Sequence, residues 1–273
     1  MKHALHRILL LQLLTTLGLQ GNVPTCGYLS IFYKCSINSS FFSALGSEII
    51  NGEKVPDKKM LFMASVQNSR NKHICGGFLI NKDFVVTAAH CDVGNPTSVV
   101  LGTHNLKNID DTMRYSVKRC KHRCYDKVCE GSDIMLLKLS KKAQLNQRLQ
   151  PISLPETETR IANRETCSVA GWGLTSVGDP DELQMVNVPI VDLDVCKNEW
   201  PNMLPEKVIC AGGYGTNKGF CQGDSGGPLV CNGKAAGVVS YNWDNNCRYP
   251  NRPNVYTDVS KFLPWIRKMM KDC

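Results

Sequence analysis

The chain lacks three features that assign proteins to common classes: a long apolar run beyond its N-terminal segment, cysteine pairs at CxxC spacing, and internal repeats. Without about 18 consecutive apolar residues, no membrane anchor is expected. Without CxxC pairs a reduced metal-binding protein is disfavoured. Because no internal repeat of about 20 to 50 residues is visible, a solenoid or propeller is not indicated. Aromatic residues make up only 7% of the chain, and the most basic stretch, residues 117–127, has no array of stacking aromatics. We therefore expect no nucleic-acid partner.

Cysteine, in contrast, is abundant. Fourteen cysteines in 273 residues are typical of an oxidising compartment and a disulfide framework. The formal net charge is +8, which favours anionic partners such as a sulfated polysaccharide. Solvated surface lysines explain the charge equally well, so both interpretations stay open.

The N-terminus is typical of secretion. A basic start, residues 2–7, precedes the apolar run Ile8–Leu19, which predicts a signal peptide over residues 1–20. A second site that looks right for cleavage lies at residues 44–46, so the signal would end there if residues 21–48 contain an insertion rather than a prosegment. We expect a protein that is secreted or stored in secretory granules.

Beyond residue 48 the chain consists of short apolar runs separated by Gly, Pro and Asn. Such runs lie at residues 61–67, 76–90, 133–140, 166–173 and 234–241. Many short strands with frequent turns predict an all-β sandwich or barrels.

The tail is the exception, because residues 258–271 have helical spacing. One face would carry Phe262, Trp265, Ile266 and Met269. Asp258 or Ser260 would cap the start, and Pro264 indicates that the regular helix begins close to it.

The stretch GFCQGDSGGPLVC, residues 219–231, surrounds Ser225 with small residues. A serine nucleophile needs a base and donors for the oxyanion, and the N–H groups of Gly223 and Ser225 are the candidate donors. Among six histidines, only His90 lies where an apolar strand gives way to small residues, in VVTAAHC. Asp133 opens the apolar run DIMLLKL and is the candidate for the carboxylate that orients the histidine.

The segments IING, TAAHC, DIMLLKL, AGWG, CQGDSGGP and VVSY follow one another in this order. Through them, residues 49–273 strongly resemble the chymotrypsin-like (trypsin-fold) serine proteases. The resemblance implies two six-stranded antiparallel β-barrels with a C-terminal helix, and a serine-type endopeptidase that cuts protein or peptide substrates through an acyl-enzyme. It implies no metal and no organic cofactor, and we expect a monomer.

The resemblance also implies an activating cut. Cleavage after Glu48 would free the amine of Ile49, which would pair with Asp224. A pro-sequence ending in Ser47-Glu48 resembles the granzyme, mast-cell protease and duodenase branch, in which a dipeptidyl peptidase removes a dipeptide ending in Glu. An activating peptidase is therefore an expected partner. The dipeptide route fits a signal cut after Gly46, whereas a longer prosegment needs a different protease.

The family's cysteine pattern maps onto four pairs. The implied disulfides are Cys75–Cys91, Cys167–Cys231, Cys196–Cys210 and Cys221–Cys247, each worth about 2–4 kcal/mol. The remaining cysteines, Cys26, Cys35, Cys120, Cys124, Cys129 and Cys273, stay unassigned. Cys124 and Cys129 would close a small loop before Asp133, and a zinc site there lacks a regular ligand set.

The resemblance places the substrate pocket at Gly219, Phe220, Ser240, Tyr241, Asn242 and Asn254. Trypsin-like members carry aspartate at the position of Gly219, so no strong preference for Lys or Arg is expected. Two interpretations stay open. We favour a narrow, polar slot for a small or medium uncharged residue; a chymase-like slot for Phe, Tyr or Leu would result if Phe220 swings out. Ser240 to Asn242 should also offer a strand edge to an extended substrate.

Two alternatives to a granule protease follow from the same residues. One is a protease-like protein that does not cut, because Phe220, Asn242 and Asn254 occlude its pocket, and that binds anionic partners through its basic surface. The other is a digestive protease secreted constitutively. A trypsin-sensitive activating cut would indicate the latter, and Glu48-Ile49 is not such a site.

Overall fold

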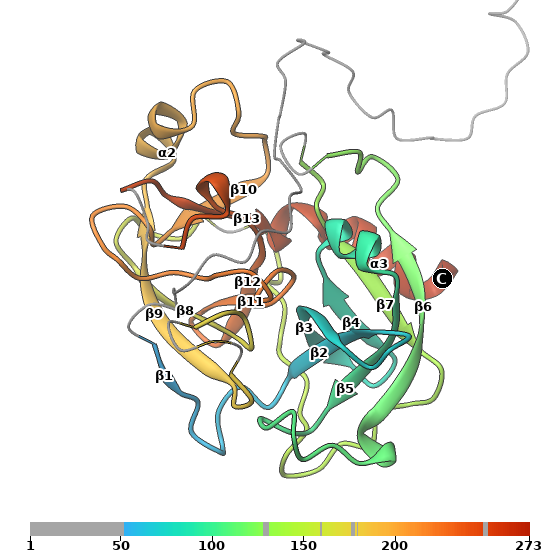
Figure 1. The fold of residues 1–273 in the computed structure, drawn as a ribbon. Helices are drawn as coiled ribbons and strands as arrows, with labels where there is room; N and C mark the ends of the chain where they lie inside the picture. The colour runs from blue at the N-terminus through green and yellow to red at the C-terminus, as the bar shows by residue number, and fades with distance from the viewer. Residues whose placement is uncertain (1–51, 128–130, 159, 176–177, 179, 248–250) are drawn as a thin grey trace, which may run out of the picture. The chain divides into compact units, whose positions relative to one another are not determined.

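The computed structural model describes residues 52–127, 131–158, 160–175, 178, 180–247 and 251–273. The predicted signal peptide (residues 1–20), the segment 21–48, Ile49 and Cys129 lie outside this part. Within it, no helix is long and apolar enough to span a bilayer. The strands form two closed antiparallel barrels, as the resemblance implies (Figure 1).

Barrel 1 closes in the order β2-β3-β4-β7-β6-β5. Its strands are β2 (Met63–Asn68), β3 (His73–Asn81), β4 (Phe84–Thr87), β5 (Pro96–Leu101), β6 (Arg114–Lys121) and β7 (Met135–Leu139). β4 is buried along its whole length, because its apolar side chains face the barrel interior on one side and the rest of the protein on the other.

Barrel 2 closes through β8-β9-β10-β13-β12-β11, and the short β1 (Glu53–Lys54) extends it from β9. Its strands are β8 (Thr166–Gly171), β9 (Gln184–Val191), β10 (Val208–Ala211), β11 (Pro228–Cys231), β12 (Lys234–Tyr241) and β13 (Asn254–Asp258). Bulges interrupt the register of β12 with both neighbours, and such irregularities redirect side chains.

Short helices complete the fold: η1 (Ala89–Gly94), η2 (Asp111–Met113), α2 (Leu193–Glu199), η4 (Trp243–Asn245), η5 (Val259–Phe262) and α3 (Leu263–Asp272). The predicted tail helix is confirmed. Asp258 caps η5 through Ser260 N (2.9 Å), and Pro264 lies in the first turn of α3.

The helix α3 follows barrel 2 in the chain but packs against the core of barrel 1. The predicted face contributes to this core, with Phe262 and Ile266 buried and Trp265 and Met269 packed around them. The C-terminal segment therefore ties the two barrels together (Figure 1).

The four disulfides implied by the resemblance are present: Cys75–Cys91, Cys167–Cys231, Cys196–Cys210 and Cys221–Cys247. A fifth joins Cys120 of β6 to Cys273 at the end of the chain. No sequence pattern indicated this pair, because 153 residues separate the two cysteines. Cys124 is also disulfide-bonded.

Candidate active site

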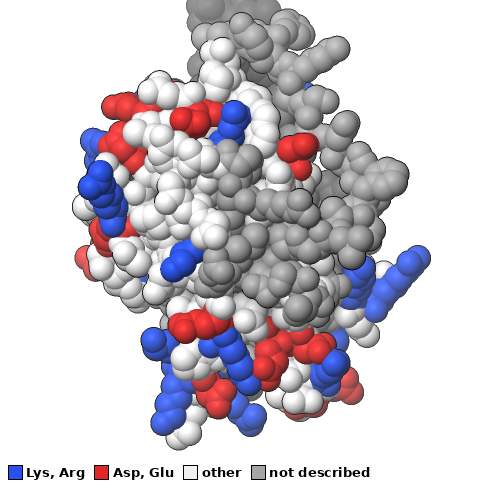
Figure 2. Space-filling view, turned by 60° about the vertical axis from the view of Figure 1, so that its left-hand side comes forward, with Lys and Arg blue, Asp and Glu red and all other residues white. Residues whose placement is uncertain are grey.

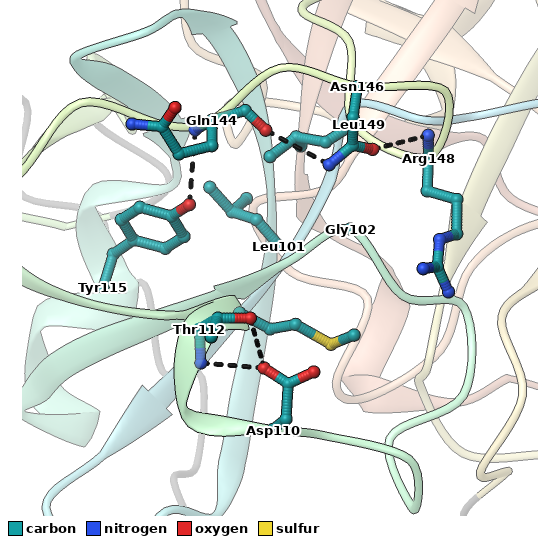
Figure 3. Close-up of a pocket in the computed structure, with 10 residues that line it drawn as sticks. Leu101, Gly102, Asp110, Thr112, Tyr115, Gln144, Asn146, Arg148 and Leu149 are labelled. Carbon is teal, nitrogen blue, oxygen red and sulfur yellow. Dashed lines mark hydrogen bonds between the residues drawn. The ribbon is translucent and has the colours of Figure 1, made fainter.

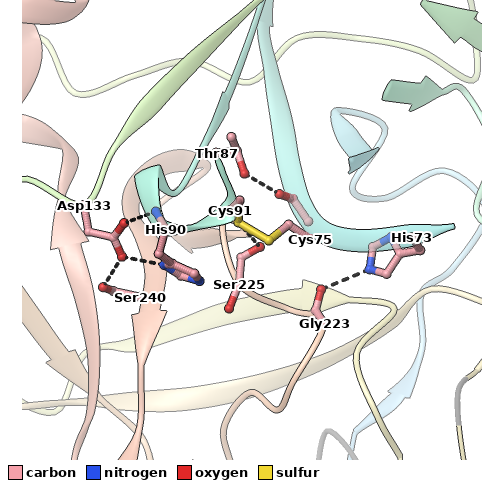
Figure 4. The surroundings of a disulfide bond; sticks show 10 residues. His73, Cys75, Thr87, His90, Cys91, Asp133, Gly223, Ser225 and Ser240 are labelled. Carbon is pink, nitrogen blue, oxygen red and sulfur yellow. Dashed lines mark hydrogen bonds and ion pairs between the residues drawn. A yellow bond between two sulfur atoms is a disulfide. The ribbon is translucent and has the colours of Figure 1, made fainter. Parts of the chain in front are cut away.

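His90 and Asp133 come from neighbouring strands of barrel 1. His90 lies in η1, just after β4, and Asp133 lies just before β7. Because Thr87 pairs with Met135 in the β4–β7 ladder, the chain leaves β4 and enters β7 at the same end of the barrel. Ser225 comes from the loop before β11 of barrel 2. The structure therefore brings the three predicted residues together, with His90 between the other two (Figure 4).

Two hydrogen bonds fix His90 on Asp133. The ring Nδ1 lies 2.8 Å from Oδ2, and the backbone N–H of His90 donates to Oδ1 at 2.9 Å. Two residues of barrel 2 hold Asp133 from the other side: Ser240 Oγ donates to Oδ2 (2.6 Å), and Thr257 Oγ1 donates to the main-chain oxygen (3.0 Å). Asp133 is 1% exposed, so its carboxylate is locked in one orientation.

This arrangement makes His90 a stronger base. Burial disfavours the charged imidazolium, but the charge of Asp133 and the hydrogen bond to it outweigh burial and raise the pKa of His90. Burial likewise works against ionised Asp133. The contacts with His90 and Ser240 prevail and lower the pKa of Asp133. A base that gains affinity for a proton beside a fixed carboxylate is suited to accept one from a hydroxyl.

The main chain around Ser225 is held by barrel 1 and by its own loop. Gly76 N donates to the carbonyl of Ser225 (2.8 Å), and Gly227 N donates to that of Asp224 (2.9 Å). The second bond turns the peptide between Asp224 and Ser225, so the N–H of Ser225 points the opposite way. A side chain on Gly76 would come within 3.2 Å of Gly227, which explains a glycine there.

The peptide before Gly223 is oriented in the same way. Leu174 N donates to the carbonyl of Gln222 (2.8 Å), so the N–H of Gly223 points away from Leu174. Gly223 has φ +98°, a conformation that glycine adopts at low cost. No described acceptor takes a hydrogen bond from the N–H of Gly223 or Ser225, and both residues remain partly exposed. Such paired donors can bind a developing oxyanion.

A histidine that the sequence analysis did not select also supports this loop. His73 Nε2 lies 3.0 Å from the carbonyl of Gly223, and its Nδ1 lies 2.8 Å from Ser65 Oγ. The ring packs edge-on against Trp172. His73 thus links barrel 1 to the Gly223 peptide. Its sequence neighbourhood, HICGG, is that of an ordinary strand and carried no signal.

Asp224 is completely buried. Its carboxylate accepts hydrogen bonds from Gly173 N and Cys221 N, both at 2.8 Å. Burial raises the pKa of Asp224 to about 7, and the two N–H donors only partly oppose this. Within the described part of the chain no cation pairs with it, and buried carboxylates normally have a partner.

The predicted pocket residues lie close together and are almost inaccessible. Phe220 (3% exposed) packs edge-to-face on Tyr256, with ring centroids 5.3 Å apart. The ring is therefore inside barrel 2 and has not swung out. Asn254 and Tyr256 are two residues apart in β13, so their side chains lie on the same face of the strand. Asn254 Nδ2 and the Tyr256 hydroxyl are both buried and have no hydrogen-bond partner among the described residues.

Two other pocket candidates have specific contacts. Ser240 bonds to Asp133, so it belongs to the His90–Asp133 arrangement as well as to the strand edge. Tyr241 packs edge-on against Trp200, with centroids 5.2 Å apart, and its hydroxyl donates to Met203 O (3.3 Å). Gly219 is buried, and Asn242 is 8% exposed.

A separate hollow of about 180 Å³ lies in barrel 1 (Figure 3). It is lined by residues from the end of β5, around η2, the start of β6 and the segment after β7, among them Gly102, Asp110, Tyr115 and Arg148. None of the triad candidates lines it, so it is distinct from the site.

Comparison with known proteins agrees with this geometry. The family model described as "Trypsin" matches residues 49–266. Duodenase-1 of Bos taurus is 40% identical over 230 residues, which cover 82% of this chain and 90% of duodenase-1. The chain belongs to the trypsin family of serine proteases.

Two further relatives show the same. Mast cell protease 8 of Mus musculus is 39% identical over 84% of this chain and 92% of its own length. The solved structure of neuropsin, "a serine protease expressed in the limbic system of mouse brain", superposes with a TM-score of 0.73 at 32% identity, and covers 81% of this chain and 99% of neuropsin. The protein is therefore a serine-type endopeptidase related to the granzyme and mast-cell protease group.

Proposed function

We propose that the protein is a secreted or granule-stored endopeptidase that acts through His90, Asp133 and Ser225. The observation that carries this proposal is the 2.8 Å hydrogen bond between His90 Nδ1 and buried Asp133, on the side of the imidazole away from Ser225. That arrangement fixes the tautomer in which Nε2 is free to accept the serine proton.

The proposed reaction follows from the contacts. Ser225 Oγ attacks the peptide carbonyl, and His90 takes the serine proton. The N–H groups of Gly223 and Ser225 stabilise the oxyanion, and Asp133 stabilises the imidazolium. His90 then gives the proton to the leaving amine. In the second half of the reaction, water attacks the acyl-enzyme while His90 takes a proton from it, and His90 returns this proton to Ser225 Oγ as the ester bond breaks. The nucleophile, the base and the oxyanion donors of the proposed reaction are all groups of the protein itself.

We infer that cleavage after Glu48 activates the enzyme. Asp224 supports this proposal, because it is a buried carboxylate beside Ser225 without a cation in the described chain. The new amine of Ile49 would supply the missing charge. The pair would fix the loop that carries the two N–H donors.

The pocket supports a specificity that is not trypsin-like. No acidic side chain lies at Gly219, and Phe220 fills space near Tyr256. Asn254 and Tyr256 offer unpaired polar groups, so an uncharged residue that can hydrogen-bond fits better than Lys or Arg.

Acidic side chains neutralise part of the basic surface. In Figure 2 acidic and basic residues are interspersed on the described part of the face shown. Arg119 and Lys121 of the basic stretch both pair with Asp92, at 3.0 Å. A sulfated polysaccharide would bind basic residues other than Arg119 and Lys121, and retention on heparin with elution by salt would measure this binding.

One experiment tests the catalytic proposal. The chain is produced from a free Ile49, treated with an active-site phosphonate, and profiled against peptides that vary at the residue before the cut. Labelling of Ser225 with cleavage after uncharged residues supports the proposal. A sharp Arg or Lys preference would contradict the pocket argument. A folded protein that neither labels nor cuts would be a non-cutting protease-like protein.

A further inference from the structure

A cationic stack lies just beyond the end of β12, next to the strand edge expected to bind substrate. The guanidinium of Arg252 lies 3.6 Å from the centroid of the Trp243 ring and 5.5 Å from that of Trp200. The two indoles are 5.6 Å apart. Trp243 is 36% exposed and Trp200 only 4%, so the stack rises from the core to the surface.

The stack is anchored from below. Trp200 Nε1 donates to the carbonyl of Pro253 at 2.9 Å, which fixes the residue next to Arg252. Trp200 also packs against Tyr241, the last residue of β12. The position of Arg252 is thus coupled to the strand that passes Asp133.

The Trp243 ring covers the face of the Arg252 guanidinium and leaves the edge of the guanidinium available for hydrogen bonds. The five N–H donors lie in the guanidinium plane, and a ring 3.6 Å away contacts the π-face. Among the described residues Arg252 takes part in no ion pair; Asp244, which follows Trp243, forms none with it. A planar fork held in place with free donors is suited to bind a carboxylate with two hydrogen bonds.

The distance from the scissile bond follows from the strand. Ser240 touches Asp133, and Trp243 is three residues further along, at the start of η4; the backbone between them is extended through the end of β12 and Asn242. At about 3.3 Å per residue this is about 10 Å. A substrate extended along residues 240–242 therefore brings its third or fourth residue before the cut to Trp243 and Arg252.

We propose that Arg252, held by Trp243, binds the carboxylate of an acidic side chain at the third or fourth substrate residue before the scissile bond. The inference rests on the proposed endopeptidase function. It assigns charge recognition to a position outside the pocket, because the pocket residues Gly219, Phe220 and Asn254 are uncharged.

The test uses pairs of peptides that differ only in Glu or Gln at each of these two positions. The enzyme that begins at Ile49 should cleave the Glu peptide with about fivefold to tenfold higher kcat/KM at one position, as expected for a charge-assisted contact at a partly exposed site. The ratio should fall as salt rises. In Arg252→Gln it should drop to about one.

Lys268→Gln is the matched control, because it removes the same charge from an exposed site on α3 and should leave the ratio unchanged. The ratio is measured within one preparation, so incomplete folding of a variant does not affect it. Equal rates for Glu and Gln at both positions, or a preference that survives Arg252→Gln, would overturn the inference. Phosphonate labelling separates this result from failure of the endopeptidase proposal, in which neither labelling nor cleavage would occur.

Discussion

The hydroxyl of Ser240 donates a 2.6 Å hydrogen bond to Oδ2 of Asp133, the same oxygen that faces His90 Nδ1. One residue of barrel 2 therefore completes the environment of a carboxylate that belongs to barrel 1. Because Asp133 is 1% exposed, water does not replace this donor easily. The two barrels must pack correctly before His90 has its full basicity.

Ser240→Ala is the first prediction. The hydrogen bond helps to lower the pKa of Asp133, and its loss leaves the ionised, buried carboxylate less stabilised and less firmly oriented toward His90. We expect kcat/KM to fall about tenfold to a hundredfold, since a buried hydrogen bond to a charged group is worth about 1.5–3 kcal/mol. Steady-state kinetics with phosphonate titration measures this. Thr257→Val, which removes only the bond to the Asp133 carbonyl, should cost less.

Asp133→Asn gives the second prediction, a change in pH dependence. His90 must be neutral to act as a base, and Asp133 raises its pKa. The acid limb of kcat/KM in the native enzyme should therefore lie above pH 6.5, the ordinary value. In the variant the limb should move to lower pH, and kcat should fall about 10⁴-fold, as for Ser-His-Asp triads in general. An unchanged limb would mean that another group controls it.

The all-β character and the candidates His90, Asp133 and Ser225 could be predicted because the sequence encodes them locally, whereas the two barrels followed from the family resemblance. Short strands, TAAHC and GDSGGP are continuous stretches, and each needs only its own neighbours to be recognised. The contacts of Ser240, His73 and Cys120 with their partners could not be predicted. Each joins residues more than 100 positions apart, and only the closed barrels bring them together.

The third prediction concerns Asp224. In the uncut chain Ile49 has no free amine, and burial raises the pKa of Asp224 to about 7 from 3.8. As pH rises, Asp224 loses its proton in the unfolded chain before it does so in the folded chain. The free energy of unfolding of the uncut chain should therefore decline from about pH 4 to about pH 7. The cost is on the order of 4 kcal/mol.

The chain cut at Ile49 should behave differently. In the proposed ion pair, the amine of Ile49 would neutralise Asp224 and remove most of this decline, up to the pH at which the amine loses its proton. Urea unfolding of both forms at pH 5 and pH 8 measures the difference. Equal losses of stability in the cut and uncut chains would contradict the proposed pair.

The fourth prediction concerns the disulfide that the sequence did not indicate. Cys120–Cys273 fastens the end of α3 to β6, and α3 packs on the barrel 1 core. The double variant Cys120→Ser, Cys273→Ser should lose about 2–4 kcal/mol of unfolding free energy, measured by urea. Since neither cysteine touches His90, Asp133 or Ser225, kcat/KM per titrated site should stay within about twofold.

The last prediction distinguishes the two pocket interpretations. Phe220 packs against Tyr256 in barrel 2 and is 3% exposed, so its ring takes up room that a substrate side chain would need. Phe220→Ala removes the ring and leaves a cavity next to the pocket. Stability should fall by about 3–5 kcal/mol, and profiling should show a new preference for Phe, Tyr or Leu before the cut, because a large apolar side chain would refill the space. Val169→Ala, a core truncation in the same barrel, is the control for destabilisation alone and should leave the preference unchanged. If the native enzyme already prefers Phe, Tyr or Leu, Phe220 moves when substrate binds, and the narrow-slot interpretation is wrong.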